Sequence, residues 1–158
     1  FGMSVEVRTV REPELRVQVV DQRTAFDNDP EAFVSSTQSS QDALQQKVIS
    51  AQGILQSVNI DDDLRLKISA ICGELDVDGL RGDIVTNRSA RALAAFEARN
   101  EVTEEDIARV ISCSLRHRLR KDPLEQIDSG DRVIKAFCKI FDRGDQTTLS
   151  DFELASTE

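Results

Sequence analysis

Apolar side chains recur every three or four residues over most of this 158-residue chain, which is the spacing of one face of an α-helix. Helix-capping signals stand between these stretches: Asp61 precedes one, and Thr103 with Asp106 forms a capping box before another. The chain is therefore predicted to be mainly α, with a bundle of four or five helices. The apolar stripes lie at 44–58, 64–75, 84–96, 107–119 and 133–141.

The start of the chain follows a different pattern. Residues 3–10 alternate between apolar and polar side chains, which predicts a half-buried strand, and a helix is expected from Pro13 to about Asp27. A single strand needs partners, so we expect residues 1–34 to be the end of a larger α/β domain. The polar run 35–41 is predicted to be a linker, residues 42–141 a helical domain, and residues 142–158 a disordered acidic tail.

Charge and hydropathy exclude several function classes. The formal net charge is −9, and an acidic chain is not attracted to phosphate backbones, so we expect no nucleic-acid partner. No run of 18 apolar residues is present, so no membrane span is expected. The chain begins with Phe1 rather than Met, and we expect it to be part of a longer protein.

Signatures of catalysis are missing from the sequence. It contains no glycine-rich phosphate loop of the G-x-x-x-x-G-K-[ST] type, and its one histidine, His117, has no nucleophile beside it. The three cysteines form no C-x-x-C pair, so a metal site is not expected. The chain alone is therefore predicted to be inactive, with no catalytic residue of its own.

The segment 74–91, ELDVDGLRGDIVTNRSAR, combines a helix start with an arginine. Asp78 is predicted to cap a helix beginning near Leu80, which places Arg81 in its first turn. Free N–H groups at a helix start attract phosphate, and a guanidinium adds a bidentate phosphate ligand. The alternative is that Arg81 is a surface residue paired with Asp78 or Asp83, because surface ion pairs are common.

The segment 115–123, LRHRLRKDP, is the one basic run in the chain. We interpret it as the last turn of a helix, whose cations oppose the negative end of the helix dipole. A subunit contact or a phosphate contact is the alternative. His117 is expected to be packed or solvated rather than a ligand.

Cys72 and Cys113 lie on separate predicted helices. Two inert, buried thiols are the simplest expectation. A regulatory disulfide is the alternative, and it requires Cα atoms within roughly 4.4–6.8 Å of each other.

These segments resemble the ATPase subunit I of magnesium chelatase, from Phe1 to about Phe141. FGMSVEVRTVREPELR is similar to the segment that follows the family's arginine finger, while ELDVDGLRGDIVTNR and LRHRLRKDPLEQIDSG are similar to its helical lid. The resemblance implies an AAA+ fold in which residues 1–34 close the α/β core and the helical domain is the lid. It also implies that Arg81 is the sensor-2 arginine, which reaches bound nucleotide, and that the Walker motifs lie upstream of Phe1.

The resemblance also implies cofactors and partners for the intact subunit. It would use ATP and Mg²⁺ in a hexameric ring of I subunits, and it would drive Mg²⁺ insertion into protoporphyrin IX together with the D and H subunits. Plant relatives suggest Cys72 and Cys113 as a redox pair, thioredoxin as a partner, and the chloroplast stroma as the compartment, with the cyanobacterial cytoplasm as the alternative. The competing functions are a remodelling ATPase of the MoxR or helicase-like type and a plain helical interaction module.

Overall fold

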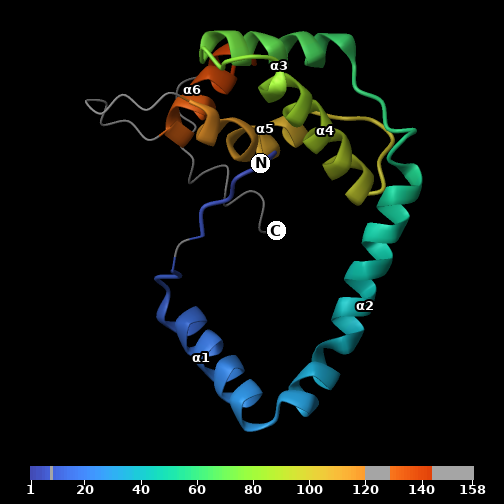
Figure 1. Cartoon of the computed structure of the whole chain (residues 1–158), viewed down its shortest axis with the longest axis vertical. Helices are drawn as coiled ribbons and strands as arrows, with labels where there is room; N and C mark the ends of the chain where they lie inside the picture. The colour runs from blue at the N-terminus through green and yellow to red at the C-terminus, as the bar shows by residue number, and fades with distance from the viewer. Residues whose placement is uncertain (8, 120–128, 144–158) are drawn as a thin grey trace. The chain divides into compact units, whose positions relative to one another are not determined.

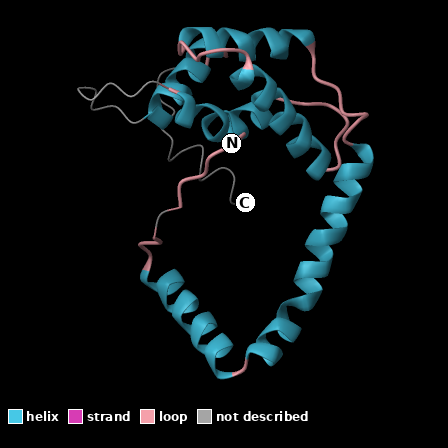
Figure 2. Cartoon of the chain, viewed as in Figure 1, coloured by secondary structure: helices cyan, strands magenta, loops and turns pink. Residues whose placement is uncertain are grey.

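The computed structural model of the chain describes residues 1–7, 9–119 and 129–143. Helices dominate these residues, as predicted, and Figure 2 shows no strand among them. The nearest approach to a sheet in the described residues is a single parallel bridge between Asn59 and Glu101. The helices are α1 (Pro13–Asn28), α2 (Pro30–Ile54), α3 (Asp62–Glu74), α4 (Arg81–Phe96), α5 (Glu104–Leu115), the 3₁₀ helix η1 (Arg116–Arg118) and α6 (Ser129–Ile140).

The chain divides into two compact units. Residues 6–50 form an N-terminal unit made of α1 and most of α2, and neither helix buries a side chain. Phe26 and Phe33 meet edge-on across the short turn between these helices, with ring centroids 5.8 Å apart. The second unit, here called the bundle, combines Phe1–Val5 with the chain from Ala51 onward.

Residues 35–41, expected as a linker, are helical in the structure. Helix α2 begins at Pro30 and runs through this polar stretch to Ile54 without a break. Its start is well specified, because Asp29 Oδ1 accepts a hydrogen bond from the Ala32 amide at 2.9 Å and proline occupies the first helical position. The division into an α/β core end, a linker and a lid stays a prediction.

The strand expected at residues 3–10 is wrong for the residues that the structure describes. Residues 1–7 and 9–12 have no regular secondary structure. An alternating segment forms a strand only when its backbone groups pair with a neighbour, and the Ser4 amide instead bonds to the end of a helix. The predicted tail is described only to Arg143, so the expectation of disorder beyond it lies outside the described residues.

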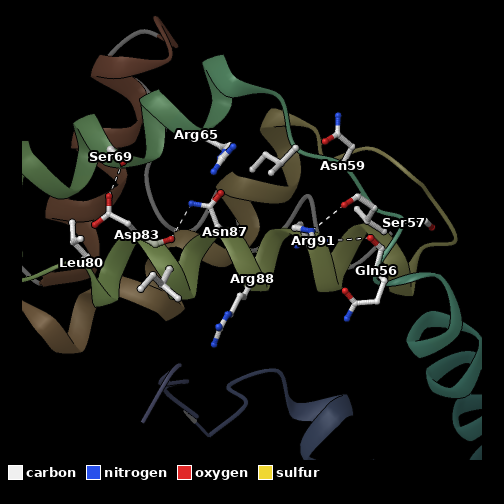
Figure 3. A pocket seen from close by; sticks show the side chains of 13 residues that line it. Gln56, Ser57, Asn59, Arg65, Ser69, Leu80, Asp83, Asn87, Arg88 and Arg91 are labelled. Carbon is white, nitrogen blue, oxygen red and sulfur yellow. Dashed lines mark hydrogen bonds between the residues drawn. The ribbon is translucent and has the colours of Figure 1, made fainter.

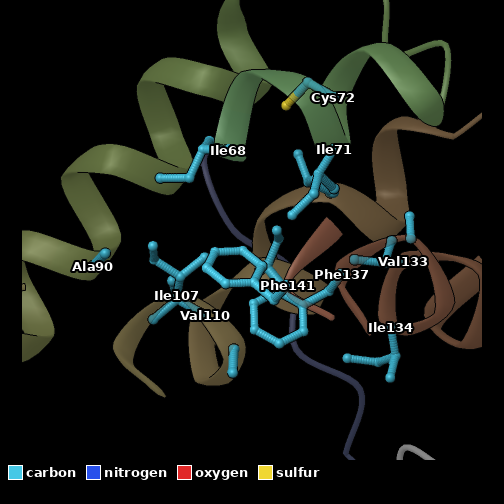
Figure 4. Close-up of a cluster of buried hydrophobic side chains, with 14 of the residues drawn as sticks. Ile68, Ile71, Cys72, Ala90, Ile107, Val110, Val133, Ile134, Phe137 and Phe141 are labelled. Carbon is cyan, nitrogen blue, oxygen red and sulfur yellow. The ribbon is translucent and has the colours of Figure 1, made fainter. Parts of the chain in front are cut away.

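The core of the bundle is formed by α3, α4, α5 and α6, which Figure 1 shows gathered together. Helix α5 contacts each of the other three helices. Figure 4 shows Ile71, Val133, Phe137 and Phe141 meeting at the centre, where the two phenylalanine rings stack with centroids 4.4 Å apart. The fully buried residues include the predicted stripe positions Ile68, Ile71, Ile107, Ile111, Leu115 and Val133.

Helix α4 buries a different face from the one expected. The spacing of the 84–96 stripe predicts that Ile84, Arg88, Ala92 and Phe96 or their neighbours are buried; Ile84 and Ala92 are exposed, and the buried residues are among their neighbours. The buried positions Gly82, Thr86, Ala90 and Ala94 follow one another at four-residue spacing. Small residues allow α4 to approach α5 closely, so packing distance rather than hydrophobicity selects this face.

Three helices of the bundle end in the same way. Asp76, Ala98 and Asp142 have positive φ angles of 50°, 57° and 53°, and each stands two residues after the last residue of its helix. In each case the next amide bonds back to a helix carbonyl five residues earlier, for example Val77 N to Cys72 O at 3.0 Å. This is the Schellman turn, which satisfies carbonyls that the helix leaves open.

Candidate functional site

The turn between α3 and α4 sets the position of Arg81. After the Schellman turn at Asp76, the chain turns again at Gly79, whose φ of +70° favours glycine. Helix α4 then starts at Arg81 with Leu80 as its N-cap, and no side chain caps it. The prediction that Asp78 caps this helix is therefore wrong, and the first amides of α4 remain open to an external acceptor.

Arg81 is exposed in the first turn of α4 and has no hydrogen bond or ion pair with any described residue. The alternative pairing with Asp78 or Asp83 is not seen. Asp83 instead accepts a hydrogen bond from Ser69 Oγ at 2.7 Å, which links α3 to α4. A guanidinium with no partner among the described residues, beside a helix start that no side chain caps, is an arrangement suited to a phosphate group.

Gly82 fixes the start of α4 against its neighbours. A Cβ atom at this position would lie 3.0 Å from Leu115 Cδ2 and 3.0 Å from Val77 Cγ1, and 3.3 Å from Cys72 Sγ. Only glycine fits here without movement of those side chains. The close contact holds the residue after Arg81 on α3 and α5, so the arginine stands at a defined place on the surface of the bundle.

Both cysteines of the predicted redox pair are free thiols in the structure. Burial raises the pKa of the Cys72 thiol to about 12, and the nearby Asp83 carboxylate adds to the shift. Cys113 is half-buried on α5. Leu115 faces the Gly82–Cys72 contact, and residues two apart on a helix point in different directions, so Cys113 faces away from Cys72 in this conformation.

Arg116–Arg118 of the basic run form the 3₁₀ helix η1 directly after α5, which ends at Leu115, so the described part of the run extends this helix end by one tighter turn. Arg118 Nε donates to Ser114 O at 3.0 Å, so its cation satisfies an open carbonyl at the negative end of the helix. His117 is an exposed residue. The part of its ring that is buried, together with the nearby Arg118 charge, lowers the pKa of the imidazole. Residues 120–123 of the basic run lie outside the described residues.

A groove of about 680 Å³ lies beside α4, against the chain that joins α2 to α3 (Figure 3). Arg91 spans the groove and donates to Val58 O at 2.9 Å and to Leu55 O at 3.2 Å. These hydrogen bonds fix the segment between α2 and α3 against α4. In the view of Figure 3, Arg65 lies above α4 and Arg88 below it. The arginines therefore form no common anion site.

Sequence reasoning missed the partners of several polar side chains. Arg91, Arg99 and Arg118 all bind groups that are distant in sequence or in a loop, and periodicity shows only that they lie off the apolar stripe. A usable signal existed for Asp106, since it is the acidic member of the predicted capping box. Among the residues that the structure describes, no cluster of histidine, cysteine and acidic side chains could hold a metal ion.

Comparison with known proteins shows what this chain is similar to. Residues 65–136, which span α3 to α6, match the family described as AAA lid domain. The chain is 63% identical over 141 residues to "Magnesium-chelatase subunit ChlI" of Synechocystis sp. (strain ATCC 27184 / PCC 6803 / Kazusa), a match that covers 89% of this chain. Residues 65–136 are therefore similar to AAA lid domains, and the chain is similar over 141 residues to magnesium-chelatase I subunits. The exposed Arg81 therefore stands at the start of a lid helix.

Further relatives agree with this assignment. "Magnesium-chelatase subunit ChlI" of Anabaena variabilis is 60% identical over 141 residues, and the protein of the same name from Cyanophora paradoxa is 57% identical over 141 residues. The chain spans about 40% of the length of these relatives, with shares of 40%, 42% and 41% for the three named here. Within the described part of the lid and the N-terminal unit, no helix is long and apolar enough to cross a membrane.

Proposed function

We propose that this chain is the lid portion of the ATPase motor of magnesium chelatase, in which ATP hydrolysis drives Mg²⁺ insertion into protoporphyrin IX. The observation that carries the proposal is Arg81: it is exposed, unpaired among the described residues, and placed beside the open amides that begin α4. The similarity to magnesium-chelatase I subunits over 141 residues supplies the reaction. The Walker motifs would lie in sequence upstream of Phe1.

Arg81 is the residue of this chain that would contact ATP. Its guanidinium can form two parallel hydrogen bonds to phosphate oxygens, and the first amides of α4 add a partial positive charge. Bound ATP, with Mg²⁺, supplies the free energy of phosphate transfer. The lid arginine would bind the phosphates and so tie the orientation of the lid to the state of the nucleotide.

The rest of the lid would keep that arginine in place. Gly82 packs on α3 and α5, and the Ser69–Asp83 hydrogen bond joins α3 to the first turn of α4. Because these contacts fix the start of α4 to the core of the bundle, a pull on Arg81 would move the four helices together rather than bend one of them.

The partners of the intact subunit follow from the same proposal. It would assemble with other I subunits in a ring and act with the D and H subunits of the chelatase, with porphyrin handled on the H subunit. Its compartment would be the chloroplast stroma or, for a cyanobacterial protein, the cytoplasm. The acidic surface argues against nucleic acid as a partner.

Cys72 and Cys113 form the redox part of the proposal, with thioredoxin as the reductant. The pair requires a rearrangement of α5 relative to α3, since the two side chains face different directions here. Mass spectrometry after mild oxidation would test it: a Cys72–Cys113 linked peptide that thioredoxin removes supports the pair. Oxidation of Cys113 without a link to Cys72 would count against it.

The test of Arg81 uses the longer natural subunit that contains this chain. Arg81→Ala should lower ATP hydrolysis by about tenfold or more while leaving much of ATP binding intact, because one charged contact to phosphate is lost. Arg88→Ala is the matched control, since Arg88 is an exposed arginine on the same helix. Equal hydrolysis by the parent and Arg81→Ala would remove the nucleotide role.

A further inference from the structure

Arg91 of α4 holds the main chain of residues 55–61, which connect α2 to α3 and are here called the joining segment. Its Nε donates to Val58 O at 2.9 Å, and its Nη2 donates to Leu55 O at 3.2 Å. The same Nη2 also donates to Gln56 O at 3.5 Å. A guanidinium presents five donors in a fixed fork, so one side chain can hold three carbonyls of a turning chain.

These carbonyls need a donor because they follow the end of a helix. Helix α2 ends at Ile54, and the last carbonyls of a helix have no partner within it. A positive charge is favourable at this end, which is the negative end of the helix dipole. Within the described helix α2, the last turn contains no basic side chain of its own. Arg91 supplies that cation from a different helix.

The groove of Figure 3 separates this contact from the packing of the core. Gln56, Ser57 and Asn59 of the joining segment line the groove, and Ile84 and Asn87 of α4 line it as well. The dashed lines in Figure 3 run from the Arg91 side chain to the joining segment. The contact is therefore made by a guanidinium that crosses the groove, and it can be removed without changing the backbone of α4.

A second contact ties the joining segment to the loop that follows α4. The Asn59 amide donates to Asn100 O at 2.8 Å, and the Val102 amide donates to Asn59 O at 3.0 Å. These bonds make the parallel bridge between Asn59 and Glu101. The joining segment is thus held at two places, by the side chain of Arg91 and by the chain directly after α4.

Helix α4 carries both this contact and the candidate phosphate ligand. Arg81 is its first residue, and Arg91 follows ten residues later in the same unbroken helix, about 15 Å along its axis. We propose that Arg91 is a positioning residue that couples Arg81 to the joining segment, so that a displacement of α4 by bound nucleotide reaches the end of α2. The inference rests on the proposed nucleotide role of Arg81 and adds the route by which that role leaves the lid helix.

Hydrogen exchange in the longer natural subunit tests the structural half of the proposal. Arg91→Gln should speed exchange of the Ser57 and Asn59 amides by about tenfold or more, because charge-assisted hydrogen bonds that hold this backbone are lost. The amides of α5 and α6 should exchange as in the parent, which excludes general destabilisation. Arg88→Gln is the matched control, since Arg88 is an exposed arginine on the same helix.

The functional half is measured with the longer subunit, the D and H subunits, ATP, Mg²⁺ and protoporphyrin IX. Arg91→Gln should leave the KM for ATP unchanged and lower the Mg-protoporphyrin IX formed per ATP hydrolysed by about fivefold or more, as for the loss of a coupling between two sites. Arg91→Lys keeps a cation that can reach one carbonyl at a time, so it should restore part of this ratio. Arg91→Met keeps the apolar stem and replaces Arg91→Gln if that variant does not fold.

Two results would overturn the inference. The first is unchanged exchange of the joining segment in Arg91→Gln. The second is a fall of ATP hydrolysis and product formation in the same proportion, which would mean that Arg91 acts through stability or the nucleotide site alone. Failure of the proposed function has a different signature, because the parent itself would then form no product with competent partners.

Discussion

Replacement of Arg99 by methionine tests how much one buried carboxylate contributes to the lid. Asp106 is 1% exposed and stands at the start of α5. Arg99 Nη1 donates to Asp106 Oδ2 at 2.8 Å, and the Thr103 amide donates to the same oxygen at 2.8 Å. Methionine keeps most of the apolar stem of arginine and removes the charge, so it isolates the ion pair from the packing.

The size of the effect follows from the burial of Asp106. Removal of one partner of a buried ion pair costs about 3–5 kcal/mol, because the other charge stays buried without compensation. The side chain of Arg99 is 34% exposed, so water can reach the vacated space, and we expect the lower end, about 3 kcal/mol. For a chain of this size that corresponds to a Tm lower by about 6–12 °C.

The pH dependence gives a second readout of the same pair. Burial acts to raise the pKa of Asp106, but the hydrogen bonds from Arg99 and Thr103 outweigh it and the pKa is lowered. A lowered carboxyl pKa stabilises the fold fully above the unfolded value of about 4, and this contribution is lost as the pH falls through the folded-state pKa. The stability difference between the parent and Arg99→Met should therefore narrow in acid.

Urea unfolding at pH 7 and at acid pH measures both effects. Arg65→Met is the matched control, because Arg65 and Asp62 form an exposed pair with side chains 60% and 89% exposed, and such pairs contribute about 0–1 kcal/mol. If Arg99→Met lowers the free energy of unfolding no more than Arg65→Met does, the buried ion pair does not stabilise the lid as argued. A difference that does not change with pH would refute the assignment to Asp106.

Four further substitutions should also change the free energy of unfolding measurably in urea. Thr86→Val should stabilise the lid by about 1 kcal/mol, because the Thr86 hydroxyl is fully buried without a partner in the described structure; a loss would reveal a hidden partner. Ala98→Gly should raise the free energy of unfolding by about 1 kcal/mol, because Ala98 has a φ of 57° that glycine adopts without strain. Ala95→Gly should lower it by about 1 kcal/mol, because glycine is unfavourable inside a helix such as α4. Asp61→Ala should cost about 1 kcal/mol, because Asp61 caps α3 by accepting from the Asp63 amide at 2.8 Å; no change would show that water replaces the cap.

Local signals predicted the bundle well because they act within a few residues. The Asp61 cap and the Thr103–Asp106 capping box stand where the sequence placed them, and the apolar stripe of α5 is buried as expected. Helix α2 begins at Pro30, before the predicted linker rather than after it, although Asp29-Pro30-Glu31 carries a cap, a first-turn proline and an acid. The polar composition of 35–41 was read as a linker, yet it contains no glycine or proline to break a helix.

Features that depend on distant residues could not be predicted. The inward face of α4 is set by how closely α5 approaches, so small residues rather than Ile84 are buried. The fate of residues 3–10 depends on a partner, and in this chain Arg118 and Cys113 supply it. Arg81 is exposed and its side chain has no partner among the described residues, which is likewise a property of the folded surface; the spacing in the sequence left an ion pair with Asp78 or Asp83 open as the alternative.

Formation of Mg-protoporphyrin IX by the longer natural subunit tests the central claim most directly. The subunit would be mixed with D and H subunits, ATP, Mg²⁺ and protoporphyrin IX, and product fluorescence would be followed for the parent, Arg81→Ala and Arg88→Ala. The proposal predicts product from the parent and Arg88→Ala, and none or little from Arg81→Ala. Equal product from all three would contradict the role of the lid arginine, and no product from the parent with competent partners would contradict the chelatase function itself.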